Sequence, residues 1–144
     1  LIEEVLADLS PLAEKRGITL LQPAEPDITI CGSDILIYQV VFNLTENAVR
    51  YNRENGSVTI TAAKRGKDAV ITVSDTGPGI SEEFRESVFE PFFRVDKSRS
   101  RSLGGVGLGL ALVHEITTLH GGTVQITESS ENGTVFEVCL PLAV

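Results

Sequence analysis

The chain has 144 residues, a length that suits one domain, and its 42% hydrophobic and 22% charged residues are typical of a globular protein rather than a disordered or fibrous one. Its formal net charge of -8 argues against broad electrostatic binding to nucleic acid or to an anionic membrane. We therefore expect no nucleic-acid partner and no direct membrane contact. Cys31 and Cys139 form no CxxC pair, and we expect both to be buried packing residues of a reduced protein.

Helical spacing of apolar residues is the clearest signal along the chain. The first predicted helix is interrupted by Pro11 and ends at Gly17, while Ser33 or Asp34 predicts the N-cap of the second. Helices are predicted at residues 1–16, 34–50 and 108–119, with a short helical piece from residue 81.

Short runs rich in β-branched residues predict the strands. They lie at residues 18–21, 28–31, 57–63, 69–75, 123–127 and 134–140. Gly66 lies in the short connection between the third and fourth runs, which predicts a β-hairpin. The chain is therefore expected to mix helix with largely antiparallel sheet.

Two glycine clusters lie where backbone could approach a ligand closely. Residues 75–79 (DTGPG) follow a predicted strand, and residues 104–109 (GGVGLG) precede a predicted helix, whose N-terminal amides favour an anion such as phosphate. Neither cluster is a P-loop or a dinucleotide-binding GxGxxG motif. Each taken alone is better explained as a turn, so the clusters admit phosphate binding without requiring it.

A pair of asparagines marks the second predicted helix. Asn43 and Asn47 are four residues apart and therefore share one helical face. A carboxamide oxygen can take one position around Mg²⁺ while phosphate oxygens and water fill the others. The alternative is that both amides brace nearby backbone.

Basic residues gather in a stretch without regular apolar spacing. Arg94, Lys97, Arg99 and Arg101 lie within eight residues of an otherwise acidic chain. A basic loop beside a glycine-rich helix start is what a lid over a triphosphate requires. We therefore predict a lid in this stretch.

In order and spacing these segments resemble the catalytic and ATP-binding domain of sensor histidine kinases. Residues 43–52 (NLTENAVRYN) resemble the N box, 75–80 (DTGPGI) the G1 box, 89–94 (FEPFFR) the F box and 105–109 (GVGLG) the G2 box. The resemblance covers nearly the whole chain. It extends to the wider GHKL superfamily of Hsp90, gyrase B and MutL. Around the lid it is close to kinases with large periplasmic or extracellular sensor regions, including those of the vancomycin-sensor type.

The resemblance implies a fold and a set of roles. The fold would be α+β, the Bergerat α/β sandwich, with a mixed, mostly antiparallel sheet packed in two layers on three helices. Asn47 would ligate Mg²⁺, with Asn43 supporting metal and phosphates and being the one candidate for a catalytic role. Asp75 would accept a hydrogen bond from the exocyclic amine of adenine. The other implied ATP contacts are Arg50, Tyr51, Gly77, Gly79, Ile80, Arg94, Lys97, Arg99, Gly105, Val106, Gly107, Leu108, Gly109 and Thr134.

One departure from the superfamily bears on mechanism. Hydrolytic relatives carry a glutamate general base at the position of Asn43, and an amide cannot take a proton from water. Glu46 is acidic but lies about 100° around the helix from Asn47. We therefore expect the domain to hold ATP until a better nucleophile arrives.

The resemblance also implies that the nucleophile lies outside this chain. In such kinases it is a histidine on a helical dimerisation domain, whereas His114 and His120 are expected to pack or cap here. We expect residues 1–144 to be one domain of a longer kinase, whose helical dimerisation domain lies outside this sequence and is its partner. We expect this domain to act on a response regulator only indirectly and to work in the cytoplasm, with the parent protein anchored in the bacterial membrane.

Alternative functions remain open at this point. A GHKL protein-serine kinase of the anti-sigma type would usually keep an acid at the position of Asn43. A non-catalytic ATP sensor or docking module would bind nucleotide without transferring phosphate. Functions of the gyrase or MutL type would require the hydrolytic glutamate and a basic surface that faces DNA.

Overall fold

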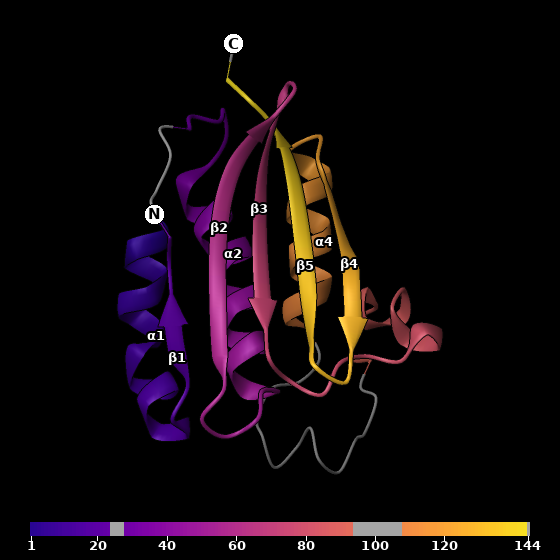
Figure 1. The fold of residues 1–144 in the computed structure, drawn as a ribbon. Coiled ribbons are helices and arrows are strands. Elements are labelled where there is room, and N and C mark those ends of the chain that lie inside the picture. Colours follow the sequence, from indigo (N-terminus) through magenta and orange to yellow (C-terminus); the bar gives the residue numbers. More distant parts are fainter. Residues whose placement is uncertain (24–27, 94–107, 144) are drawn as a thin grey trace.

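The fold is described here from a computed structural model, which describes residues 1–23, 28–93 and 108–143 (Figure 1). The α-helices of these ranges are α1 (Ile2–Arg16), α2 (Asp34–Arg50) and α4 (Gly109–Leu119). The strands are β1 (Thr19–Leu21), β2 (Ser57–Arg65), β3 (Asp68–Asp75), β4 (Thr123–Ser130) and β5 (Gly133–Pro141). Short 3-10 turns, η1 (Glu82–Phe84) and η2 (Ser87–Phe89), follow β3.

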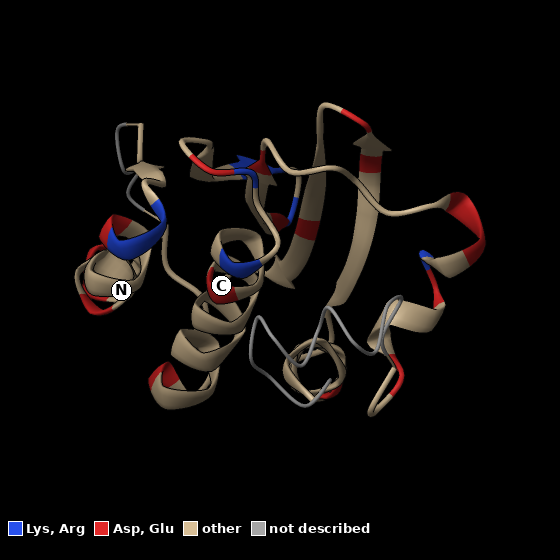
Figure 2. Cartoon of the chain, turned by 90° about the horizontal axis from the view of Figure 1, so that it is seen from below, with Lys and Arg blue, Asp and Glu red and all other residues tan. Residues whose placement is uncertain are grey.

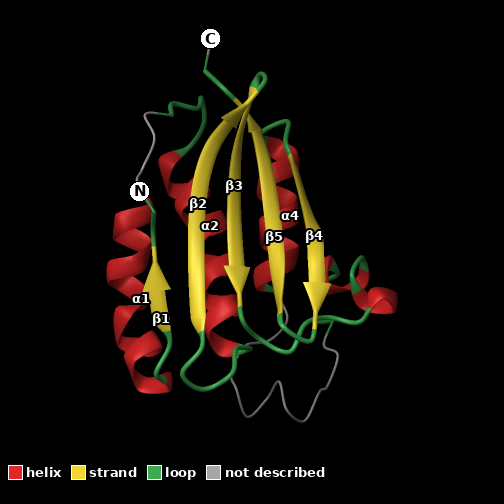
Figure 3. Ribbon diagram, in the orientation of Figure 1, coloured by secondary structure: helices red, strands yellow, loops and turns green. Residues whose placement is uncertain are grey.

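The described strands form one sheet in the order β1-β2-β3-β5-β4. β1 runs parallel to β2, and every other neighbouring pair is antiparallel. Helices α1, α2 and α4 cover one face of this sheet, and the other face is open (Figures 1 and 3). The prediction of a two-layer sandwich, with a mixed and mostly antiparallel sheet on three helices, is confirmed for the described residues.

The helix boundaries follow from local chemistry. Ser33 caps α2, because its Oγ accepts the backbone N–H of Leu36 at 3.2 Å. Gly17 ends α1 in the left-handed conformation, and its N–H donates to carbonyls of the last turn. Pro11 lies inside α1 without ending it. Both helix ends match the predicted ones.

The core lies between the helices and the sheet. Side chains on one face of each helix meet the inward face of the strands, as helical and alternating patterns require. The largest fully buried side chains are Val5, Val40, Val41, Leu44, Val49, Val58, Ile60, Val73, Val113, Ile116, Phe136 and Leu140. These contacts fix the position of α2 and α4 relative to β3 and β5.

Two sequence predictions are wrong in this part of the molecule. Residues 28–31 form no strand, and Ile30 makes only an isolated antiparallel bridge to Leu142. Cys31 is exposed and Cys139 half-buried, so neither is a fully buried packing residue. The last residues of the chain pass Ile30 at a single point, which leaves this segment without the partner that a strand needs.

The segments that carry the predicted site residues lie together at one edge of the sandwich. The end of α2, the end of β3, the β4–β5 turn and the start of α4 all lie at the bottom of Figure 1. Figure 2 views this edge from below, with the helices on one side and the strands on the other. Helix α2 and helix α4 contact each other here.

Candidate functional site

Helix α2 places the asparagine pair on the surface that faces α4. Asn43 and Asn47 are one turn apart, and both side chains are half-buried. A methyl group added at Gly109 would lie 3.5 Å from Asn43 Oδ1, so the first residue of α4 passes beside the Asn43 amide. The structure thus brings the end of the predicted G2 box to the predicted N box.

Arg50 lies at the end of the same helix and pairs with an acidic side chain. Its guanidinium lies 3.5 Å from the carboxylate of Glu46, one turn earlier. Both side chains remain partly exposed, so solvent screens this ion pair. The carboxylate of Glu46 thereby points along the helix toward Arg50.

Asp75 ends β3 and is held by backbone from two directions. Its Oδ1 accepts the N–H of Gly77 at 2.8 Å and the N–H of Thr134 on β5 at 3.3 Å. Burial raises the pKa of Asp75, while these two N–H groups act in the opposite direction. Within the part of the chain that the structure describes, no hydrogen bond reaches the second carboxylate oxygen, Oδ2, so this atom could accept one from a ligand.

The loop after Asp75 needs glycine at both predicted positions. A methyl group at Gly77 would lie 2.7 Å from the carbonyl oxygen of Tyr51, too close for any side chain. Gly79 has φ of 84°, and a methyl group there would lie 2.1 Å from the carbonyl oxygen of Ser130. The loop therefore packs closely between the end of α2 and the end of β4. The ring of Tyr51, at the end of α2, is partly exposed.

Asn52 was missed as a candidate, although it is one of the few buried polar residues described. Its Nδ2 donates to the carbonyl of Ser57 at 2.9 Å, and its Oδ1 accepts from the backbone N–H of Arg53 at 2.8 Å and from Thr76 Oγ1 at 2.9 Å. Arg16 at the end of α1 donates to the carbonyl of Asn52 at 3.0 Å. This network fixes the residue after Asp75 to the end of α2.

We expect Asn52→Ala to lower the free energy of unfolding by about 1.5 kcal/mol, because Thr76 and Arg53 would lose a buried acceptor. Chemical denaturation measures this difference. Asn132→Ala, in the exposed β4–β5 turn, is the control and should change it by less than about 0.5 kcal/mol. Equal stability of both variants would show that the network contributes nothing.

Ser129 was also missed. Its Oγ accepts the N–H of Ile80 at 2.8 Å and lies 2.9 Å from Thr134 Oγ1. Its carbonyl accepts from the guanidinium of Arg85 at 3.0 Å. An open cleft of about 280 Å³ lies beside these contacts, lined by residues 78–82, Arg85 and 129–131.

Several predicted site residues lie outside the described ranges. These are Arg94, Lys97, Arg99, Gly105, Val106 and Gly107. Leu108 is the first residue described after them and is partly exposed at the N-terminus of α4. The predicted lid therefore stays a prediction.

The two histidines make contacts that suit packing and capping. His120 Nδ1 lies 2.8 Å from the carbonyl of Ile116, and Nε2 accepts the N–H of Ser33 at 3.3 Å, joining the end of α4 to the start of α2. The ring of His114 lies 6.1 Å from that of Phe89. Phe89 also meets buried Phe136 edge to face, so this F-box residue anchors the η2 turn to the core.

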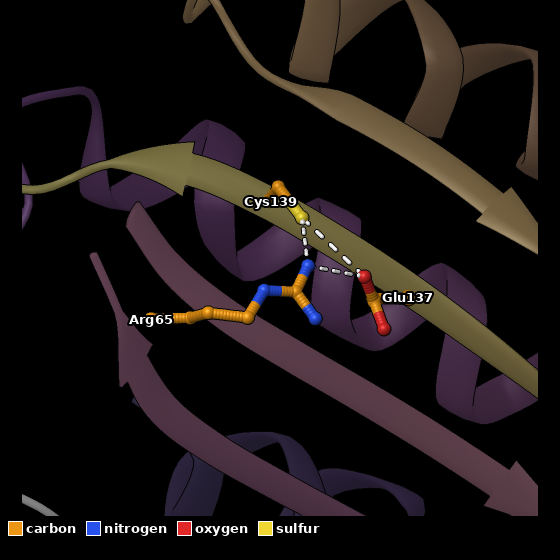
Figure 4. Close-up of polar contacts among 3 residues, drawn as sticks. All are labelled: Arg65, Glu137 and Cys139. Carbon is orange, nitrogen blue, oxygen red and sulfur yellow. Dashed lines mark hydrogen bonds and ion pairs between the residues drawn. The ribbon is translucent and has the colours of Figure 1, made fainter. Parts of the chain in front are cut away.

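A polar cluster on the open face of the sheet lies apart from this site (Figure 4). Arg65 Nη2 lies 2.7 Å from Glu137 Oε1 and 3.3 Å from Cys139 Sγ. Burial and the neighbouring Glu137 raise the pKa of the Cys139 thiol, while the hydrogen bond from Arg65 lowers the pKa of Glu137. Arg65 is largely exposed, so solvent screens this ion pair.

The donor set at the edge fits a nucleotide-bound metal better than a protein-held one. Within the described ranges, no group of three or more His, Cys, Asp or Glu side chains could hold a metal ion. The amide oxygens of Asn43 and Asn47 could supply one or two oxygen ligands, and Mg²⁺ commonly takes its others from phosphate and water. In the same ranges, no helix has the length and apolar character to span a bilayer.

Comparison with known proteins places these observations in a family. Residues 32–144 match the family described as Histidine kinase-, DNA gyrase B-, and HSP90-like ATPase. The sensor-like histidine kinase SenX3 of Mycolicibacterium smegmatis is 34% identical over 141 residues, which are 98% of this chain and 37% of that protein. The chain thus spans little more than a third of the length of this relative.

Solved structures show the same fold. Full-length ShkA in complex with AMPPNP is similar with a TM-score of 0.87 and 30% identity, over 99% of this chain and 29% of that one. The catalytic domain of histidine kinase ThkA has a TM-score of 0.83 and 32% identity, over 97% of this chain and 89% of that one. ThkA in complex with response regulator protein TrrA gives a TM-score of 0.80 at 29% identity, over 99% and 39% of the respective chains. On these matches, the chain belongs to the family of histidine kinase-, DNA gyrase B- and HSP90-like ATPases.

Proposed function

We propose that residues 1–144 are the catalytic and ATP-binding domain of a sensor histidine kinase. The domain binds ATP with Mg²⁺ and donates the γ-phosphoryl group to a histidine on a separate helical dimerisation domain. The response regulator is reached indirectly, and the parent protein is anchored in the bacterial membrane with this domain in the cytoplasm. The names of the relatives support this reading over a serine kinase or a docking module.

One observation carries the proposal: the carboxylate of Asp75 and the amides of Asn43 and Asn47 lie on facing elements of one edge. Asp75 Oδ1 is fully used by two backbone N–H groups, which orients Oδ2 to accept from the exocyclic amine of adenine. An amine donor is present in ATP and is replaced by a carbonyl acceptor in GTP. Asp75 is thus the residue that selects adenine, with Gly77, Gly79, Ile80, Tyr51 and Thr134 around the base.

At the phosphate end, Asn47 is the Mg²⁺ ligand and Asn43 supports it beside the start of α4. The ion, when bound, offsets the negative charge of the phosphates. Leu108 and Gly109 present backbone at the N-terminus of α4, where the helix dipole favours an anion. We keep Arg94, Lys97, Arg99, Gly105, Val106 and Gly107 as proposed phosphate contacts. Arg50 is also a proposed phosphate contact, which it can make only after its guanidinium leaves the carboxylate of Glu46.

The chemistry of the edge favours retention of ATP over hydrolysis. In the transfer, the bond between the γ-phosphorus and the bridging oxygen breaks, a phosphorus–nitrogen bond to the acceptor imidazole forms, ADP leaves with the bridging oxygen, and the ring proton of the imidazole passes to solvent. Water would need a general base to compete, and the amide of Asn43 cannot serve as one. The histidine of the partner domain is therefore the better nucleophile.

A calorimetric titration with ATP, ADP and GTP, with and without Mg²⁺, tests the proposal. We expect adenine nucleotides to bind selectively, with negligible phosphate release in the same samples. Rapid phosphate release would indicate a hydrolytic relative. If no nucleotide bound, the chain would instead be a docking module. Phosphoserine on a protein substrate, found after incubation with ATP, would indicate a kinase of the anti-sigma type.

A further inference from the structure

The pairing of β4 with β5 changes register close to Asp75. From Thr123 to Ile126 the two strands pair regularly, with Ile126 opposite Phe136. One extra residue, Thr127, then enters β4, so that Glu128 lies opposite Val135 and Ser129 opposite Thr134. This is a β-bulge, a feature that redirects the side chains that follow it. β4 and β5 run side by side to their turn at the lower edge in Figure 1.

The bulge decides which side chain faces the inner side of the sheet. Thr134 and Phe136 are buried on that side, because alternate residues of β5 point inward. Without the extra residue, the register of Ile126 would continue and bring Glu128 opposite Thr134. A second carboxylate would then lie beside Asp75, where like charges disfavour each other. With the bulge, Glu128 is exposed, and Ser129 with its neutral hydroxyl lies opposite Thr134 instead.

The hydroxyl of Ser129 connects the two backbone segments that surround Asp75. It accepts the N–H of Ile80 on the loop side at 2.8 Å. On the sheet side it lies 2.9 Å from Thr134 Oγ1, and the N–H of Thr134 donates to Asp75. Since Ser129 Oγ accepts from Ile80, its own hydrogen is available for Thr134, and the hydrogen of Thr134 can then face the base.

We infer that Ser129, set by the bulge at Thr127, is a positioning residue for adenine recognition. It acts through Thr134 and Ile80 and does not itself contact the nucleotide. This inference rests on the proposed function, because it assigns to Ser129 the orientation of groups that surround the base. It goes beyond the family motifs, since Ser129 lies in none of the N, G1, F and G2 boxes.

A double-mutant cycle on the chain tests the inference, with ADP and GDP affinities measured by calorimetry. Ser129→Ala is expected to weaken ADP binding about 10-fold and to narrow the preference for ADP over GDP. Thr134→Val should do the same, and the double variant should be no weaker than the weaker single variant, because both changes break one chain of contacts. Ser74→Ala, next to Asp75 but on the open face, is the control and should bind ADP normally.

The outcomes separate this inference from the proposed function. A wild-type chain that binds no ADP overturns the proposed function, and this inference with it. A wild-type chain that binds ADP, with Ser129→Ala binding equally well, overturns only the role of Ser129. Additive losses in the double variant, or loss of the native circular dichroism spectrum in Ser129→Ala, also overturn it, because the hydroxyl would then act independently or serve the fold.

Discussion

Replacing Asn47 by alanine is expected to remove the Mg²⁺ dependence of nucleotide binding while leaving the fold intact. Asn47 is half-buried on α2, and alanine suits a helix well, so the substitution costs little stability. The substitution is expected to weaken Mg²⁺ binding, because no cluster of acidic or histidine side chains in the described ranges could replace the amide. With an acceptor domain supplied, we expect phosphoryl transfer to fall at least about 100-fold.

Calorimetry with and without Mg²⁺ measures the first effect, and phosphorylation of the acceptor measures the second. Asn47→Asp keeps an oxygen ligand but adds a negative charge beside the triphosphate, and we expect it to lose transfer as well. Gln39→Glu, about 12 Å earlier on the same helix, makes the same change of charge away from the metal and serves as the control. If Asn47→Ala kept wild-type transfer, Asn47 would have no place in the site.

The second large effect is expected for Asp75→Asn. The amide oxygen can still accept from Gly77 and Thr134, but the amide nitrogen would face the exocyclic amine of adenine, donor against donor. We expect ADP affinity to fall about 30-fold, within the roughly 1 to 3 kcal/mol of a charge-assisted hydrogen bond. Asp68→Asn, at the other end of β3, is the control. Equal ADP affinity in Asp75→Asn and wild type would show that the base is recognised elsewhere.

The same variant should be at least as stable as the wild type at neutral pH. Burial raises the pKa of Asp75, so the folded state takes up a proton more readily than the unfolded state. The stability linked to this group is therefore fully present below the unfolded pKa of about 4, and it is lost as pH rises through the folded pKa. We expect the advantage of Asp75→Asn at pH 7 to disappear below about pH 4, as thermal unfolding at both pH values would show.

The parts of the fold that local chemistry determines could be predicted from the sequence. Gly17, the Ser33 cap and the turn at Gly66 each act within a few residues, and the structure confirms the elements that they bound. The strand predicted at 28–31 is wrong because strand formation depends on a partner, and only Ile30 has one. Alternation could indicate a strand there but could not supply its neighbour.

The candidate site divides in the same way. Asn43, Asn47, Asp75, Gly77 and Gly79 stand in compact motifs that a single sequence can display. Asn52 ends the N-box segment and Ser129 lies in no motif, yet both matter through contacts with segments far away in the chain, at Thr76 and at Ile80.

The bulge in β4 could not be predicted from the sequence either. The strand was predicted to end at Thr127, where the structure places the extra residue and then continues to Ser130. Strict alternation would have turned Glu128 inward. Only the pairing with β5 shows that Ser129 takes this position.

Helix α1 and strand β1 have a consequence for how the domain can be divided. The family match begins at residue 32, yet Val5 and Leu9 are fully or almost fully buried against the rest of the core, and β1 covers the edge of β2. A fragment cut at the family boundary would expose this apolar surface and an unpaired strand edge, both of which promote aggregation. Residues before the boundary thus belong to the cooperative unit that folds, and a stable recombinant domain must include them.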